Sequence, residues 1–161
     1  MTQNQIEYTV VMIRPGYCPE LYKKIKDSLT IAKNAYATEM SLLTNKNEIF
    51  YKIEAEDGPE ATYCIAVDKN NNVLGFIYTE ADIRTMTLWT SHVYVRPEVR
   101  KNGVYSLMMK RVLKFAKDCQ FNRVFSMVHE DNIISQCAHI GTGFKNKWHG
   151  YEIDMRETED D

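Results

Sequence analysis

Apolar residues recur along the chain at two spacings, and each spacing predicts one type of secondary structure. Short runs rich in β-branched and aromatic residues predict strands. These runs are Tyr8–Ile13, Thr62–Val67, Val73–Tyr78, Arg84–Val95, Arg123–Val128 and Lys145–Asp154. Apolar residues three or four positions apart predict helices. These segments are Pro19 to about Ala37, Gly103–Cys119 and Ile133 to about Ile140.

The order of these elements predicts an α/β fold with a mixed sheet of the α+β type. An antiparallel hairpin turns at residues 68–72, and a strand–helix–strand unit follows it, so helices are expected on the faces of the sheet. The stretch Asn45–Pro59 is ambiguous and is compatible with a short helix over 48–54 before a turn. Since no repeat or linker divides the chain, we expect a single domain over residues 1–161, with an acidic tail from about residue 156.

Composition and charge exclude several classes of function. The formal net charge of −2 provides no long-range attraction for nucleic acid or for an anionic membrane. No apolar run approaches the roughly 20 residues that span a bilayer, and the N-terminus lacks the pattern of a signal peptide, so we expect a cytoplasmic protein. Cys137 and His139 lie near His129, but no second pair of ligands has a suitable spacing, so we expect no metal.

The stretch Val93–Ser106 carries the strongest functional signal. It combines the end of a strand, a proline, a short basic loop and the first turn of a helix. The start of a helix leaves backbone N–H groups without partners, and its dipole favours an anion. Gly103 allows a close approach of the backbone, and Arg100 and Lys101 add cationic donors. The stretch therefore predicts a pyrophosphate site.

Three features of the sequence resemble the GNAT superfamily of N-acetyltransferases. The segment Arg100–Tyr105 is similar to its Q/R-x-x-G-x-G/A signature, and Val93–Pro97 looks like the strand that ends in Val-x-Pro before it. Asn132 precedes Gly143-Phe144 at a spacing similar to the second signature, N-x-x-A-x-x-x-Y-x-x-x-G-F, with Ser135 at the small-residue position. The resemblance covers roughly residues 73–155. It implies a central, mostly antiparallel sheet that is splayed at an acetyl-CoA site, with helices on both faces.

The resemblance also implies which residues hold acetyl-CoA, the expected co-substrate. Strand amides around Val93, Tyr94 and Val95 would bind the pantetheine and the thioester oxygen. The pyrophosphate would lie against Arg100, Lys101, Asn102, Gly103, Val104, Tyr105 and Ser106. Asn132 is first a candidate helix cap, and the family adds a contact with the pantetheine arm. Tyr105 stands where the family has Gly or Ala, so we expect its side chain to point away from the pyrophosphate, toward the adenine side or solvent.

Proton transfer needs two further groups. A cationic amine must lose a proton before it attacks, and the candidate bases are Glu80, Asp82 and His92, with Glu80 slightly ahead. Strand alternation places His92 on the opposite face from Val93, and a bulge would change that parity. His139 occupies the position of the family's tyrosine and is a candidate acid for the leaving thiolate. Alternatively, His139 only packs or contacts the coenzyme, and the thiolate leaves unaided.

These features predict an N-acetyltransferase that acts on a primary amine of a small molecule or a protein. The alternative is a catalytically inactive acyl-CoA-binding sensor or interaction module, which the missing tyrosine and the altered glycine motif favour. The basic loop lacks interleaved aromatic residues, so we expect no nucleic-acid partner. The sequence is compatible with a homodimer.

Overall fold

A seven-stranded mixed sheet forms the centre of the computed structural model, which describes residues 6–48, 53, 61–127, 140–147 and 150–158. Its strand order is β1-β2-β3-β4-β5-β7-β6, and β4 and β5 pair in parallel while the other neighbours are antiparallel. The strands are β1 Tyr8–Ile13, β2 Ala61–Asp68, β3 Val73–Asp82, β4 Thr87–Val95, β5 Arg123–Met127, β6 Lys145–Lys147 and β7 Gly150–Asp154. The helices are α1 Pro19–Thr44, the short 3₁₀ turn η2 Pro97–Val99 and α2 Val104–Asp118. The expected fold class is confirmed.

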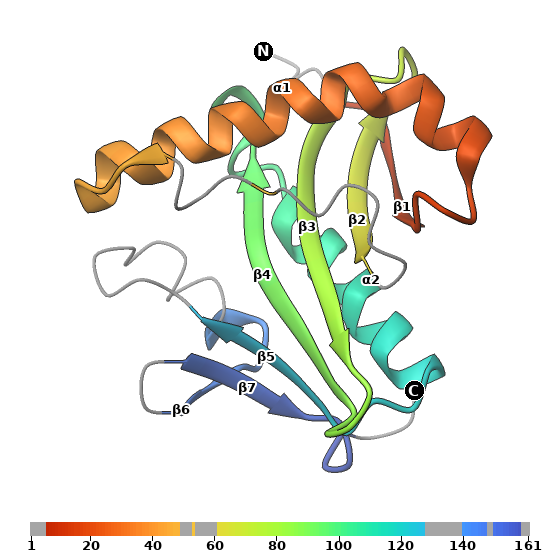
Figure 1. Cartoon of the computed structure of the whole chain (residues 1–161), viewed down its shortest axis with the longest axis vertical. Coiled ribbons are helices and arrows are strands. Elements are labelled where there is room, and N and C mark those ends of the chain that lie inside the picture. The colour runs from red at the N-terminus through yellow and green to blue at the C-terminus, as the bar shows by residue number, and fades with distance from the viewer. Residues whose placement is uncertain (1–5, 49–52, 54–60, 128–139, 148–149, 159–161) are drawn as a thin grey trace.

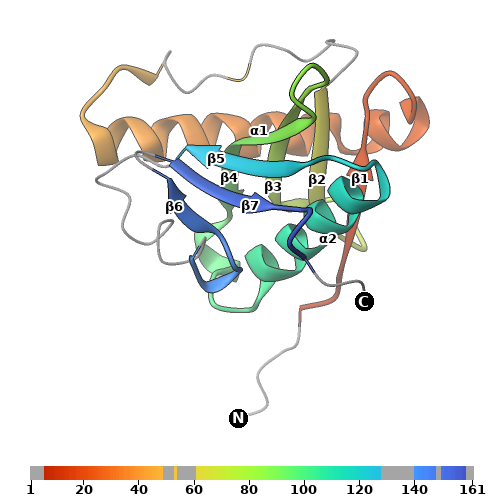
Figure 2. The same cartoon turned by 90° about the horizontal axis from the view of Figure 1, so that it is seen from below.

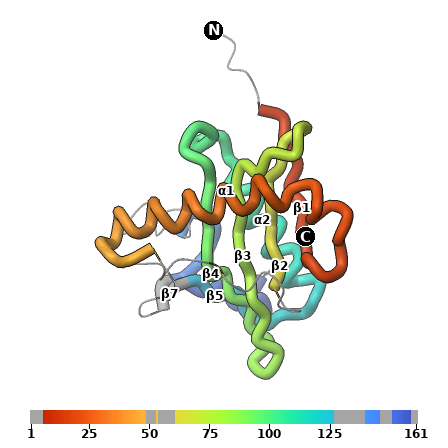
Figure 3. The backbone as a smooth tube through the Cα atoms, turned by 45° about the horizontal axis from the view of Figure 1, so that its top comes forward, coloured from red at the N-terminus to blue at the C-terminus, as the bar shows by residue number. Residues whose placement is uncertain are grey.

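The two long helices cover opposite faces of the sheet (Figures 1 and 2). Alternate residues along each strand therefore enter two separate cores. On one face, Phe76 and Tyr78 pack beneath α1, together with Tyr36 of that helix. On the other face, Ile77 of β3 and Cys64 of β2 lie in the cluster that contains the buried side of α2. Figure 3 shows α1 running across the strands rather than along them.

Helix α1 continues past the predicted end near Ala37 and reaches Thr44. No proline or glycine interrupts residues 38–44, so nothing in the local sequence stops the helix there. The helix ends at Asn45, whose φ of 56° is the left-handed conformation typical of a helix terminus.

Two predicted strands have different limits in the structure. The strand expected from Arg84 begins at Thr87, because residues 83–86 form a turn in which Met86 N–H donates to the Ile83 carbonyl oxygen at 3.3 Å. The single strand expected over residues 145–154 is a hairpin of β6 and β7. The predicted helices over 48–54 and 133–140 lie almost entirely outside the described residues. Of the first, Glu48 is described in a 3₁₀ conformation and Ile53 lies in neither a helix nor a strand; of the second, Ile140 is described as helical.

Candidate coenzyme and acceptor site

Strands β4 and β5 separate after a short parallel pairing. The pairing covers Thr87 with Arg123, Leu88 with Val124 and Trp89 with Phe125. Beyond it, residues 90–95 of β4 stay with β3, while β5 continues beside β7, and the two strands diverge toward the end of the sheet that α1 crosses (Figure 1). We call this opening between residues 90–95 and residues 126–127 the β4–β5 fork.

A bulge in β4 accompanies the fork. Tyr78 pairs with His92, but the next residue, Thr79, pairs with Thr90, so Ser91 has no partner on β3. A bulge bends the strand that carries it and increases its local twist. The bulge therefore helps to turn the end of β4 away from β5.

The backbone of β4 presents polar groups to the fork. Arg96 N–H donates to the Leu74 carbonyl oxygen at 2.8 Å, and peptide groups in an antiparallel ladder alternate in direction. The peptide groups of Val93 and Val95 therefore face the fork. The peptide group of Tyr94 faces β3 instead, and its side chain is buried on the α1 face. Of the three strand residues predicted to bind the pantetheine, Val93 and Val95 thus direct their peptide groups toward the fork, and Tyr94 does not.

The start of α2 is an uncapped helix N-terminus. Gly103 is the N-cap residue, and it has no side chain that could cap the N–H groups of the first turn. The first helical hydrogen bond runs from Leu107 N–H to the Gly103 carbonyl oxygen at 3.1 Å, so the N–H groups of residues 104–106 precede it. Gly103 has a φ of 77°, which a side chain disfavours. This geometry is suited to an anion.

The loop before α2 is held by its own side chains. Asn102 Nδ2 donates to the carbonyl oxygens of Val99 at 3.0 Å and Arg100 at 3.2 Å, so this amide braces the loop. Lys101 is exposed and has a φ of 68°. The backbone geometry at the predicted phosphate site is therefore fixed by contacts within the loop.

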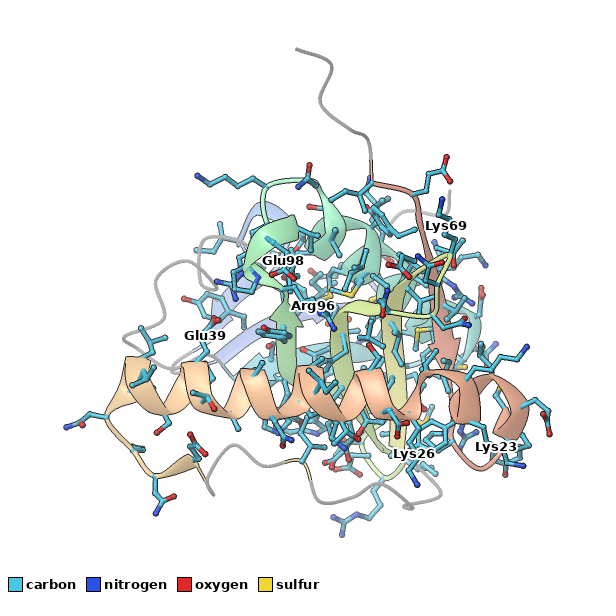
Figure 4. The ribbon with its side chains drawn as sticks, turned by 90° about the horizontal axis from the view of Figure 1, so that it is seen from above. Lys23, Lys26, Glu39, Lys69, Arg96 and Glu98 are labelled. Carbon is cyan, nitrogen blue, oxygen red and sulfur yellow. The ribbon has the colours of Figure 1, made fainter. Side chains whose placement is uncertain are left out.

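Arg100 turns toward α1 rather than toward the start of α2. Its guanidinium lies 2.7 Å from Glu39 Oε2, and its Nε donates to the Val95 carbonyl oxygen at 2.8 Å. Figure 4 shows Glu39 on α1, on the side where Arg96 and Glu98 follow β4. The cationic donor that we expected beside the phosphate is thus paired with a carboxylate of α1 and bonded to the end of β4.

Tyr105 packs inward from the first turn of α2. Its ring is half-buried and contacts the core cluster on the α2 face. Burial raises the pKa of its hydroxyl to about 12, against a smaller lowering by a hydrogen bond with Thr142. The side chain does not point into solvent, which was one of the two directions expected for it.

Two hydrogen-bonded pairs of side chains lie next to each other on the α1 face beside the bulge. The Tyr36 hydroxyl lies 2.7 Å from His92 Nδ1, and the Tyr78 hydroxyl donates to Glu80 Oε1 at 2.7 Å. The Tyr78 and His92 rings are neighbours across the strands, with centroids 5.9 Å apart. The structure therefore brings two of the predicted bases, Glu80 and His92, to one side of the sheet.

Burial sets the protonation of this group. It lowers the pKa of His92 to about 4, and the nearby Glu80 charge offsets this only in part. Burial also raises the pKa of Tyr78, and the hydrogen bond to Glu80 and the Glu80 charge add to the effect. At neutral pH, His92 is therefore uncharged and Tyr78 keeps its proton.

The bulge does not alter the relation between His92 and Val93. His92 contacts α1, whereas Val93 packs against the cluster on the α2 face, so the alternation expected for this pair is confirmed. Tyr36 was missed as a site residue, because its position on the apolar stripe of α1 is typical of a core residue.

Two candidate site residues lie outside the described residues, and several other kinds of site are not found among the described ones. His139 and Asn132 fall outside the described ranges. Within the described residues, no group of three or more His, Cys, Asp or Glu side chains is arranged to hold a metal ion. Also within them, no helix has the length and apolarity that a membrane span requires. Burial raises the pKa of the Cys64 thiol to about 12, so this thiol stays protonated.

Comparisons with known proteins agree with this geometry. The model of the acetyltransferase (GNAT) family matches residues 20–144. Tetrahymena GCN5 aligns with a TM-score of 0.68 at 8% identity, covering 93% of this chain and 96% of its own. An N-acetyltransferase from Staphylococcus aureus Mu50 gives 0.68 at 16% identity, covering 92% of this chain and 99% of its own. The PaiA N-acetyltransferase of Thermoplasma acidophilum, in complex with coenzyme A, gives 0.60 at 12% identity, with 92% and 99% covered. No curated protein matches the chain.

Proposed function

Because this chain belongs to the acetyltransferase (GNAT) family, we propose that it transfers the acetyl group of acetyl-CoA to a primary amine by direct attack. The observation that carries the proposal is the β4–β5 fork, where the edge of β4 is not paired with β5 and leads toward the N-terminus of α2, which has no side-chain cap from Gly103. Glu80 and His92 lie beside the fork, on the face of the sheet that α1 covers. The acceptor is a small molecule or a protein.

The chain offers polar groups that fit the two ends of acetyl-CoA. The peptide groups of Val93 and Val95 would pair with the pantetheine amides, as an added strand does. The N–H groups of residues 104–106 would bind the pyrophosphate, with Gly103 providing the close approach. The Thermoplasma acidophilum neighbour, which has the same fold, is a complex with coenzyme A, and this supports a coenzyme as the ligand. Acetyl-CoA bound in this way would supply a thioester whose carbonyl carbon an amine can attack.

Glu80 is the group that we assign to receive the proton of the amine. Glu80 is exposed, so an acceptor can reach its carboxylate. One carboxylate oxygen, Oε1, accepts a hydrogen bond from the Tyr78 hydroxyl. An alkylammonium group has a pKa near 10.4 and is attracted to a carboxylate, which can take its proton directly or through water. The attacking nitrogen then bonds to the acetyl carbon as the carbon–sulfur bond breaks.

His92 has a different role in this scheme. It is largely buried and uncharged at neutral pH, and its Nδ1 is occupied by the Tyr36 hydroxyl. We therefore assign it to shape the site beside the bulge. The leaving thiolate has a solution pKa of about 8.5, so an acid assists but is not essential. His139 remains our proposed acid, since it stands at the position of the family's tyrosine.

The test is the release of free CoA thiol from acetyl-CoA in the presence of a panel of amines at pH 7–8. We expect amine-dependent release, and a loss of 10²-fold or more in Glu80→Gln. Asp82→Asn is the matched control, because it removes a neighbouring acid on the same strand and should retain activity. If acetyl-CoA binds but no amine accelerates thiol release, the enzyme assignment is overturned in favour of a coenzyme-binding module.

A further inference from the structure

Two aromatic side chains lie together at the point where strands β4 and β5 separate. Trp89 and Phe125 are the last residues of the parallel pairing, and their rings meet edge to face with centroids 4.8 Å apart. Both residues are partly exposed. Within the described part of the chain, neither ring belongs to, or packs against, the two clusters of buried residues on the faces of the sheet. The pair is therefore an aromatic surface that a ligand can contact.

The two rings lie on the same face of the sheet as the carboxylate that we assign as the base. Trp89 is directly opposite Glu80 of β3, and residues directly opposite each other point to one face. Leu88 and Val124, which precede the two rings in sequence, are buried in the cluster on the α2 face. Since side chains alternate along a strand, Trp89 and Phe125 point to the other face. Helix α1 crosses that face at the end of β4, away from the start of the strand (Figure 1).

The rings stand at the inner end of the fork, where the acceptor meets the acetyl group. On the proposed function, the coenzyme occupies the edge of β4 and the start of α2, with its acetyl group near the bulge at Ser91. Glu80 and the two rings approach this point from the face opposite α2. An amine that attacks from the side of Glu80 therefore places its carbon skeleton against Trp89 and Phe125.

The charged groups around the rings determine which kind of skeleton fits. On one side is Glu80, and no described lysine or arginine forms an ion pair with it. On the other side, Phe125 is opposite Glu152 of β7. The carboxylate of Glu152 is already paired with the Arg123 guanidinium at 3.4 Å. An acceptor on this surface meets one carboxylate, then two rings, then an ion pair without net charge. This order suits an ammonium group that is followed by an uncharged, apolar skeleton.

We propose that Trp89 and Phe125 bind the carbon skeleton of the acceptor, and that the acceptor is a small primary monoamine with an alkyl or arylalkyl skeleton; this rests on the proposed function. The ammonium group faces Glu80 and gives it a proton. The neutral nitrogen then bonds to the acetyl carbon, the carbon–sulfur bond breaks and its electron pair leaves with sulfur. The rings take no part in proton transfer, and they select the acceptor by covering its apolar surface.

A series of straight-chain amines from ethylamine to hexylamine tests the class of acceptor, with release of CoA thiol as the readout. In the wild type, kcat/KM should rise about two- to fourfold per added methylene, because a fully buried methylene gains roughly 0.8 kcal/mol. Butylamine should be a better acceptor than putrescine, the diamine of the same length, because the second ammonium group would lose water against the rings. A higher kcat/KM for putrescine, or no rise along the series, would overturn the proposed class of acceptor.

Substitutions of the rings test whether they cause this rise. Trp89→Thr and Phe125→Thr each replace one ring by a residue that strands accept. Phe121→Thr is the matched control, because Phe121 is also partly exposed and pairs with the Phe115 ring, with centroids 6.4 Å apart, on the α2 face. The rise per methylene should shrink to below about 1.5-fold in the first two variants and stay unchanged in the control. Trp89→Phe should keep most of it.

The rise per methylene compares substrates within one variant, so a smaller folded fraction does not alter it. An unchanged rise in both Trp89→Thr and Phe125→Thr, with amine-dependent thiol release intact, would overturn the role of the rings alone. Absence of amine-dependent release in the wild type would overturn the proposed function together with it.

Discussion

The hydroxyl of Tyr36 lies 2.7 Å from Nδ1 of His92 and joins helix α1 to strand β4 next to the bulge. His92 is uncharged at neutral pH, because burial lowers its pKa to about 4. In the tautomer of neutral His92 that carries its proton on Nε2, Nδ1 is an acceptor and the tyrosine hydroxyl donates this bond. The bond fixes the ring of His92 and ties the helix to the strand that we assign to the coenzyme.

Removal of this hydroxyl should loosen both elements. Tyr36→Phe keeps the ring contacts with Phe76 and Tyr94 but leaves His92 Nδ1 without its donor. We expect the free energy of unfolding to fall by about 1–2 kcal/mol, measured by chemical denaturation. Tyr17→Phe is the control, since Tyr17 is 71% exposed and the loss of its hydroxyl should change stability little. Equal effects of the two substitutions would contradict the role given to the Tyr36 hydroxyl.

The lowered pKa of His92 predicts a dependence of stability on pH. The folded pKa of about 4 lies below the unfolded value of about 6.5, so the unfolded chain binds the extra proton between these values. Stability should therefore be complete above about pH 6.5, fall by up to about 3 kcal/mol as the pH falls to 4, and level off below that. His92→Gln should remove this component of the pH profile of unfolding, whereas Ser91→Ala should preserve it. An unchanged profile in His92→Gln would show that His92 is not held neutral.

The left-handed conformation of Gly103 predicts a double loss on substitution. A Cβ at this position meets open space, but the φ of 77° is unfavourable for any side chain. Gly103→Ala should lower the free energy of unfolding by about 1–2 kcal/mol and weaken the binding of CoA several-fold, measured by calorimetry. Gly16→Ala is the matched control, because Gly16 has equal space and no positive φ, and it should leave both quantities nearly unchanged. Normal CoA binding by Gly103→Ala would argue against a phosphate site at the start of α2.

The ion pair between Arg100 and Glu39 predicts that loss of an acid strengthens coenzyme binding. Glu39 holds the guanidinium at α1, and Arg100 Nε occupies the Val95 carbonyl oxygen that faces the fork. Glu39→Gln should release Arg100 for a phosphate and raise the affinity for CoA roughly two- to fivefold, as expected for a partly exposed pair. Glu20→Gln makes the same change in net charge in the first turn of α1 and should have a smaller effect. Weaker binding by Glu39→Gln would contradict the competition.

The sequence predicts the limits of a strand or helix well where a residue next to it, such as a glycine or a proline, ends it. The bounds of β1 match the prediction, and α2 differs by one residue at each end, because a glycine precedes it and its apolar stripe is continuous. The hairpin of β6 and β7 was missed, because the residues between the two strands include Trp148 and carry no typical turn pair.

Long-range contacts could not be predicted in the same way. The pairs Tyr36–His92 and Glu39–Arg100 join residues 56 and 61 positions apart, and neither has a signature within its own segment. The bulge at Ser91 is visible only when β3 and β4 are paired. The loop that we propose for the coenzyme is one continuous segment and could be recognised in the sequence, whereas the group of residues around Glu80 is brought together only by the fold.

A crystal structure of the protein with CoA tests the central claim most directly. We expect pyrophosphate oxygens within hydrogen-bond distance of the N–H groups of residues 104–106, and pantetheine amides paired with Val93 and Val95. We expect the sulfur inside the β4–β5 fork, beside the bulge at Ser91. CoA bound elsewhere, with no contact to the fork or to the start of α2, would contradict the proposed site.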